Sequence, residues 1–145
     1  IITDAGLALE AKVRLARIGY DRVVGHFLAD NLADVPSEVG RASRLTASEF
    51  LDRQSSIPHL QIIDVRGDGE FAINHLPQAI SIPVSISIPV SQLRKRLSEV
   101  SAKTPTVVYC AGGYRSSIAA SVLRANGFTD VSDVLGGFEA ILLAQ

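Results

Sequence analysis

Short apolar runs alternate with helical patterns along the chain from about residue 45 onward. The runs are rich in β-branched residues, as buried strands are, and occupy residues 60–65, 106–110 and 131–135. The helical patterns occupy residues 92–100, 116–126 and 138–144. A further short helix is expected after Thr46, because Thr46 and Glu49 have the spacing of a capping box. Strands that alternate with helices predict an α/β fold with a central parallel sheet flanked by helices.

The composition excludes several classes of protein. With 14 Lys and Arg against 15 Asp and Glu, the formal net charge is −1, so we expect no nucleic-acid partner. A single Cys among 145 residues cannot form an internal disulfide. His26 and His59 have no partners at ligand spacing, so neither a metal site nor a cofactor is expected. The apolar runs are too short to span a bilayer, and we expect no membrane partner and a cytoplasmic location.

The hexapeptide Ile-Ser-Ile-Pro-Val-Ser occurs twice in succession, at 80–85 and 86–91. Pro83 and Pro89 cannot donate to a strand ladder, and loops accept insertions at little cost. We interpret one copy as a surface insertion and expect only the other to occupy the sheet, without knowing which. The alternative is a strand with two interchangeable registers. Residues 66–70 are predicted to form a turn, and Ser91 is predicted to cap the helix over 92–100.

A weaker repeat relates residues 13–23 to residues 121–131. In each segment a helical pattern ends at a glycine, Gly19 in the first and Gly127 in the second, and an aromatic residue follows. Residues 1–30 therefore resemble the end of an earlier copy of the strand–helix–strand unit, although any amphipathic helix ending at Gly would look similar. The predicted organisation is a remnant over 1–30, a linker over 31–44 and a complete domain over 45–145. Because the chain begins with Ile, we expect it to start inside a larger protein.

Cys110 lies between a predicted strand and a predicted helix, at the start of the sequence Cys-Ala-Gly-Gly-Tyr-Arg. The two glycines allow successive backbone N–H groups to turn toward one point, which makes an anion-binding nest. The N-terminus of the following helix and the Arg115 guanidinium add positive potential. A thiol in this setting ionises more readily than a free thiol, so Cys110 is a candidate nucleophile. The alternative is that Cys110 is a small buried hydrophobe.

The sequence from about residue 44 to 145 resembles the rhodanese (thiosulfate sulfurtransferase) superfamily. The matching stretches lie at 62–66, 70–71, 74–80, 82–83, 107–116, 127–128 and 135–137. Their order and identity imply a rhodanese-like three-layer fold. The chain departs from the family in having two Ile-Pro elements where one is usual.

The resemblance implies a sulfurtransferase. Members of the family accept a sulfane sulfur from a donor such as thiosulfate, and a nucleophilic acceptor such as cyanide or a thiol removes it. Here Cys110 would be the nucleophile that carries the persulfide. The cradle for the persulfide would consist of Ala111, Gly112, Gly113, Tyr114 and Arg115. Since the chain has no second Cys, the acceptor must come from outside.

Supporting roles are expected for Asp64, Arg66, Glu70, His75 and Ser116. Asp64 and Arg66 would either tie the active-site loop to the scaffold or form a plain surface pair. For His75 we prefer a hydrogen-bonded structural role in a turn to acid–base work. Tyr114 would line the mouth of the pocket, unless it is simply exposed to solvent.

Two other functions stay open from the sequence. Phosphatase and arsenate-reductase relatives with this fold carry one more residue in the loop, and the six-residue loop from Cys110 to Arg115 favours sulfur. The other alternative is a non-catalytic sulfur-binding or regulatory module. The degenerate copy over 1–30 resembles fusions of a metallo-β-lactamase-fold domain to rhodanese domains, which include persulfide dioxygenases and related hydrolases. An N-terminal metal-dependent domain is therefore an expected partner in the full-length protein.

Overall fold

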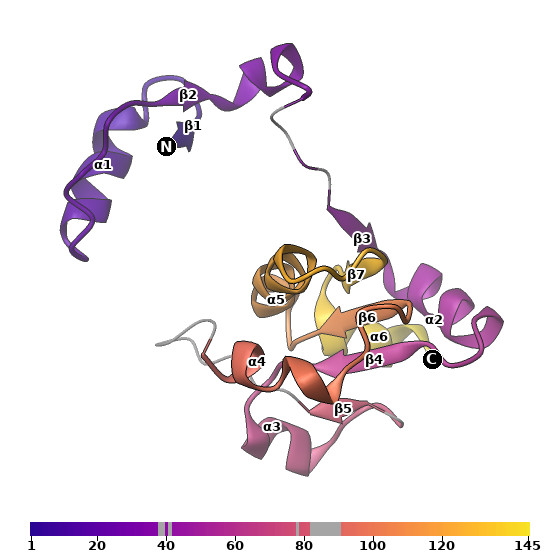
Figure 1. The fold of residues 1–145 in the computed structure, drawn as a ribbon. Helices are drawn as coiled ribbons and strands as arrows, with labels where there is room; N and C mark the ends of the chain where they lie inside the picture. Colours follow the sequence, from indigo (N-terminus) through magenta and orange to yellow (C-terminus); the bar gives the residue numbers. More distant parts are fainter. Residues whose placement is uncertain (38–39, 41, 78, 82–90) are drawn as a thin grey trace. The chain divides into compact units, whose positions relative to one another are not determined.

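The chain folds as two compact units, Ile1–Arg41 and Ala42–Gln145. The structure is a computed structural model, and it describes residues 1–37, 40, 42–77, 79–81 and 91–145. Figure 1 traces the order of the elements along the chain. Among the described residues, no helix is both long and apolar enough to cross a membrane.

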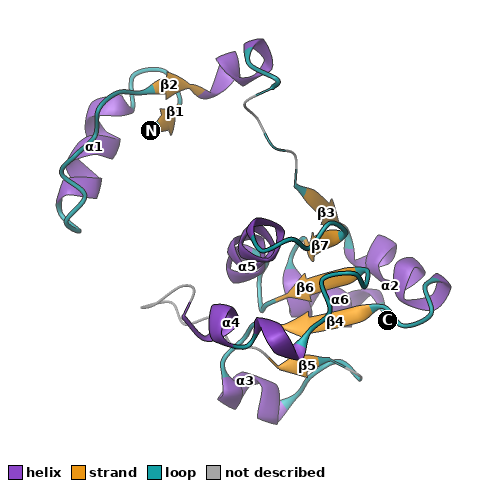
Figure 2. Ribbon diagram, in the orientation of Figure 1, coloured by secondary structure: helices purple, strands orange, loops and turns teal. Residues whose placement is uncertain are grey.

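The larger unit is built on a five-stranded sheet in the order β3-β7-β6-β4-β5, and every neighbouring pair of strands is parallel. The strands are β3 (Ser43–Leu45), β4 (Gln61–Asp64), β5 (Ile80–Ser81), β6 (Thr106–Tyr109) and β7 (Val131–Val134). The helices are α2 (Ala47–Ser56), α3 (Asp68–Ile73), α4 (Ser91–Lys95), α5 (Tyr114–Ala125) and α6 (Gly137–Ala144), with a 3-10 turn η2 at Leu97–Glu99. The predicted α/β class with a parallel sheet flanked by helices is confirmed (Figure 2).

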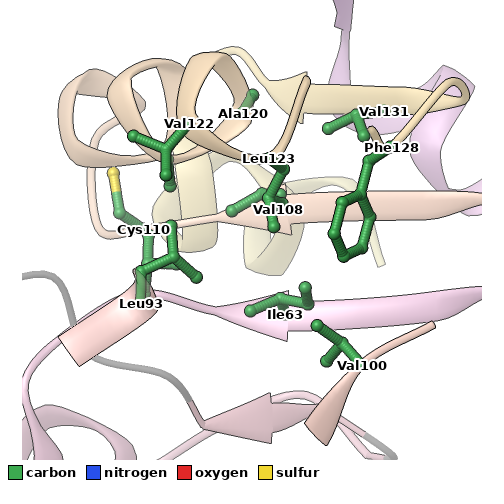
Figure 3. Packing of buried hydrophobic residues seen from close by; sticks show 12 residues of the cluster. Ile63, Leu93, Val100, Val108, Cys110, Ala120, Val122, Leu123, Phe128 and Val131 are labelled. Carbon is green, nitrogen blue, oxygen red and sulfur yellow. The ribbon is translucent and has the colours of Figure 1, made fainter. Parts of the chain in front are cut away.

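Two apolar clusters form the core, one on each face of this sheet. Val108 and Cys110 lie in the first cluster, with side chains of α4 and α5, as Figure 3 shows. Val107 and Tyr109 lie in the second cluster, with side chains of α2 and α6. Successive residues of β6 thus enter opposite clusters, because side chains alternate across a strand. Burial on both faces explains why the middle residues of β4 and β6 are consecutive apolar residues.

The local predictions were largely confirmed, with three corrections at element ends. The capping box at Thr46 is present, with the Thr46 backbone N–H donating to Glu49 Oε2 at 2.7 Å. The turn predicted over 66–70 is wrong, because α3 already begins at Asp68. The Glu70 side chain accepts from the Gly67 N–H at 2.8 Å and so satisfies the start of this helix.

The other two corrections concern helices that begin earlier than predicted. The helix predicted over 92–100 is divided into α4 and η2, and Ser91 is the first residue of α4 and not its cap. Helix α5 begins at Tyr114, because Gly113 has a left-handed backbone (φ +94°) and turns the chain directly into the helix. Of the doubled hexapeptide, Ile80 and Ser81 form β5 and Ser91 begins α4. The rest lies outside the described residues, so the prediction that one copy occupies the sheet stays a prediction.

The smaller unit contains β1 (Ile2–Thr3), α1 (Ala8–Ala16), β2 (Phe27–Leu28) and the 3-10 helix η1 (Ala29–Asp34). Strands β1 and β2 pair in parallel, and none of residues 1–37 is buried. The end of α1 has the same backbone pattern as the end of α5. Tyr20 N–H donates to Leu15 O as Phe128 N–H donates to Leu123 O, and the intervening glycines have φ of +86° and +88°. The origin of this unit as a degenerate repeat stays a prediction.

Candidate active site

Cys110 stands at the carboxyl end of β6, the central strand of the larger unit. Its side chain is 1% exposed and belongs to the apolar cluster that includes Leu93 and Ala119. Figure 3 shows the sulfur beside α5, at the point where β6 ends. Polar residues at the carboxyl ends of parallel strands meet at one edge of the sheet, which is where ligands bind in open α/β sheets.

The backbone after Cys110 directs one N–H group at the sulfur. The Gly113 N–H donates to Cys110 Sγ at 3.1 Å. Among the described residues, the N–H groups of 111, 112, 114, 115 and 116 have no hydrogen-bond acceptor. Three of them belong to the first turn of α5, where the partial positive charge of the helix is greatest. The loop can therefore stabilise an anion on the sulfur of Cys110.

Ser116 places a hydroxyl against the same sulfur. It is fully buried, and its Oγ lies 3.5 Å from Cys110 Sγ in a geometry that lets the thiol donate to the hydroxyl. The two groups can exchange roles when the sulfur is negatively charged, because a hydroxyl can donate as well as accept. Tyr114, in contrast, is 78% exposed. Of these two predicted site residues, the structure brings only Ser116 into contact with Cys110.

Gly137 contacts the other side of the loop, a role that was not predicted from the sequence. The Phe138 N–H donates to Cys110 O at 2.7 Å and the Glu139 N–H lies 3.4 Å from Ala111 O, so α6 binds the carbonyls of the loop. A Cβ on Gly137 would lie 2.2 Å from Cys110 O, which leaves no room for any side chain. The signal in the sequence was the pair of glycines directly after a buried strand.

Arg115 directs its guanidinium at Glu70 of α3. Its Nη1 and Nη2 atoms donate to Glu70 Oε2 and Oε1 at 2.7 and 2.9 Å, a bidentate ion pair between the loop and α3. The Arg115 hydrogen bond and that from Gly67 lower the pKa of Glu70 to about 2 despite some desolvation, so the pair is charged at neutral pH. The same Glu70 hydrogen bond raises the pKa of Arg115.

Asp64 and Arg66 form a second bidentate pair, and it is buried. Arg66 Nε and Nη2 donate to Asp64 at 3.0 and 2.7 Å, and Arg66 Nη2 also donates to Asn74 O at 2.6 Å. The guanidinium carbon lies 4.0 Å from the centroid of the Phe138 ring. Asp64 is fully buried and Arg66 is 5% exposed, which excludes the plain surface pair. The pair connects the end of β4 to the residue after α3 and to the first turn of α6.

His75 lies near this edge but forms local contacts. Its Nδ1 is 2.9 Å from Phe71 O, and its ring stacks on the Phe71 ring with centroids 4.0 Å apart. This is the hydrogen-bonded arrangement that we preferred for it, although its role in the reaction is untested. Within the described part of the chain, no cluster of three His, Cys, Asp or Glu residues could hold a metal ion.

A third ion pair was not predicted. Arg44 of β3 donates to the buried carboxylate of Asp133 in β7, with Nη2 3.0 Å from Oδ2. Arg44 Nη2 also lies 3.8 Å from the position that a Cβ on Gly113 would take, so this pair adjoins the loop. Arg44 and Asp133 are opposite one another in the β3–β7 register. A contact between residues so far apart in sequence leaves no local signal.

A family model described as a rhodanese-like domain matches residues 46–144 of the chain. The chain belongs to the rhodanese-like family. This confirms the resemblance found in the sequence and agrees with the parallel sheet and the cysteine loop after its central strand.

Several known proteins are similar to this chain over about two thirds of its length. YqhL, an uncharacterized protein of Bacillus subtilis strain 168, is 37% identical over 95 residues, which cover 66% of this chain and 68% of YqhL. A rhodanese-like domain protein from Staphylococcus aureus is 30% identical with a TM-score of 0.60, covering 68% of this chain and 90% of the other. The adenylyltransferase and sulfurtransferase MOCS3 of Oryza sativa subsp. japonica is 38% identical over 112 residues. That match covers 71% of this chain but only 24% of MOCS3, so the chain spans about a quarter of the length of this relative.

Proposed function

We propose that the larger unit is a sulfurtransferase that carries a sulfane sulfur as a persulfide on Cys110. The observation that carries the proposal is the hydrogen bond from the Gly113 N–H to Cys110 Sγ at 3.1 Å, in a loop whose neighbouring N–H groups have no acceptor among the described residues. Such N–H groups stabilise the negative charge of a thiolate before the reaction and of a persulfide after it. The MOCS3 relative is named as a sulfurtransferase, which supports the same chemistry.

The proposed cycle has two steps and needs no oxidant. The Cys110 thiolate attacks the outer sulfur of a donor such as thiosulfate, the S–S bond of the donor breaks, and sulfite leaves with the bonding electrons. A nucleophile such as cyanide or a thiolate then attacks the outer sulfur of the Cys110 persulfide, and the Cys110 thiolate leaves. Because Cys110 is the single cysteine, the second nucleophile is an external molecule.

Steady-state assays on the intact chain test this proposal. We expect thiocyanate to form from thiosulfate and cyanide with ping-pong kinetics, and Cys110→Ser to abolish the reaction. Phosphatase or arsenate-reductase chemistry would require a wider loop than these six residues. A turnover of aryl phosphate that exceeds the turnover of thiosulfate would contradict the proposal.

One observation favours a second candidate, a non-catalytic sulfur-binding or regulatory module. Cys110 is 1% exposed and packs in an apolar cluster, as an inert structural cysteine would. We rank this candidate second because an apolar environment alone would not need Gly113 to donate to the sulfur. Absence of sulfur transfer with every donor and acceptor, in a chain that is fully folded, would favour the module. We also propose that the full-length protein has a metallo-β-lactamase-fold partner domain and a cytoplasmic location. Both proposals are supported by the sequence alone.

A further inference from the structure

Three arginines lie beside the cysteine loop, and the structure pairs each of them with a carboxylate. Arg66 binds Asp64, Arg44 binds Asp133, and Arg115 binds Glu70. The first two carboxylates are buried within the fold. Glu70 alone belongs to a helix at the rim, α3, with its side chain 41% exposed. It therefore lies where its charge can act on an incoming molecule as well as on Arg115.

The hydrogen bonds that the Arg115 side chain donates go to Glu70. Both terminal nitrogens donate to the carboxylate, and Glu70 is itself fixed by the Gly67 N–H. Among the described residues, Arg115 makes no hydrogen bond to Cys110 Sγ. A bidentate pair presents a dipole to its surroundings in place of a full positive charge. The attraction for an anion beside Cys110 then comes chiefly from backbone N–H groups.

We propose that Glu70 sets the donor preference of the cysteine loop, by neutralising Arg115 and so favouring sulfane donors whose reacting group has at most one negative charge over thiosulfate, which has two. This inference rests on the proposed function. The favoured class comprises alkyl thiosulfonates and hydropersulfides. Two other cations, Arg94 and Lys95 of α4, are exposed, so solvent and salt screen their charges.

Each donor in this class reacts by a balanced exchange. With a thiosulfonate, the Cys110 thiolate attacks the outer sulfur, the S–S bond breaks and a sulfinate leaves with the electron pair. With a hydropersulfide R–S–SH, the same attack expels the thiolate RS⁻, and the proton stays on the new persulfide. Neither reaction needs an oxidant or a reductant. Methanethiosulfonate is the closest probe, because it differs from thiosulfate in having a methyl group in place of one charged oxygen.

The test measures how fast each donor adds one sulfur atom to the intact chain, by mass spectrometry, for thiosulfate and for methanethiosulfonate. The ratio of the two rates is compared between wild type and Glu70→Gln, so that the intrinsic reactivity of each donor cancels. We expect the variant to raise the thiosulfate-to-thiosulfonate ratio about tenfold, because an unpaired Arg115 attracts the second charge. Glu70→Asp retains the charge and is expected to keep the wild-type ratio.

Asp130→Asn is the matched control, since Asp130 forms a similar half-exposed pair with Arg53 at the opposite, amino-terminal edge of the sheet. It should leave the ratio unchanged. If Glu70→Gln lowers the rate of sulfur addition from both donors equally, Glu70 only holds the loop in place and the inference is wrong. If neither donor adds sulfur to the wild type, the proposed function itself fails.

A second measurement needs no variant. With Arg115 paired, the rate of thiosulfate loading on the wild type should depend only weakly on ionic strength. A steep fall with added salt would show an unpaired cation at the site and would overturn the inference.

Discussion

Gly137 shows how closely single residues are fitted around the cysteine loop. Its Cα approaches the carbonyls of Cys110 and Ala111, and a Cβ there would lie 2.2 Å from Cys110 O. Its φ of +57° is also unfavourable for other residues. We expect Gly137→Ala to lower the free energy of unfolding by at least about 2 kcal/mol, measured by urea denaturation.

Gly69→Ala is the control for this prediction, because Gly69 lies in α3 with open space around its Cα and an ordinary backbone. That change should be neutral or slightly stabilising, since alanine is the better helix former. Equal changes in the free energy of unfolding for the two substitutions would show that Gly137 is not in tight contact with the loop carbonyls.

The charge of Glu70 has a predictable dependence on pH. Arg115 lowers the pKa of this carboxyl from 4.5 to about 2. A carboxylate whose pKa is lower in the folded state stabilises the fold above its unfolded pKa, and this contribution is lost as pH falls toward the folded pKa. We therefore expect Glu70→Gln to reduce stability at neutral pH, and the difference from wild type to shrink between pH 4.5 and pH 2. Thermal unfolding at a series of pH values measures it, and a constant difference would contradict the assignment.

Among the elements, β4, α3 and α6 are held together by one buried ion pair. Arg66 binds Asp64, the Asn74 carbonyl and the face of Phe138, all at the edge where Cys110 lies. Removing one partner leaves a buried charge without compensation, at a cost of about 3–5 kcal/mol. We expect Asp64→Asn to destabilise the larger unit by roughly this amount in urea unfolding.

Burial distinguishes this pair from Arg53–Asp130, whose carboxylate side chain is 51% exposed. Asp130→Asn should therefore cause little or no loss of stability. A small loss of stability for both substitutions would mean that water reaches Arg66 and that the ion pair contributes little to the contact between β4 and α6.

The elements also show which contacts a sequence can predict. Strands β4, β6 and β7 and the capping box at Thr46 depend on neighbouring residues, and each was predicted correctly. Strand β3 was missed, because its first two residues were assigned to the linker over 31–44. The start of α3 was missed because Gly67 and Gly69 favour turns, and the capping by Glu70 is a contact that only the folded chain reveals. The pairing of Arg44 with Asp133 depends on the register between two strands separated by most of the domain, which a local pattern does not contain.

For the molecule as a whole, the core lies in Ala42–Gln145. The buried residues of the described chain begin at Phe50, whereas none of residues 1–37 is buried. A segment with no buried apolar surface contributes little hydrophobic free energy. We expect a chain consisting of residues 42–145 to have the same thermal unfolding midpoint as the full chain, in a cooperative transition. A markedly lower midpoint would show that residues 1–41 stabilise the larger unit.

Persulfide formation on Cys110 tests the central claim most directly. The intact mass of the chain is measured after incubation with thiosulfate, and again after addition of cyanide. The account predicts a gain of one sulfur atom that cyanide removes, with neither change in Cys110→Ser. A folded wild-type chain that gains no sulfur from thiosulfate, methanethiosulfonate or a hydropersulfide would contradict the account.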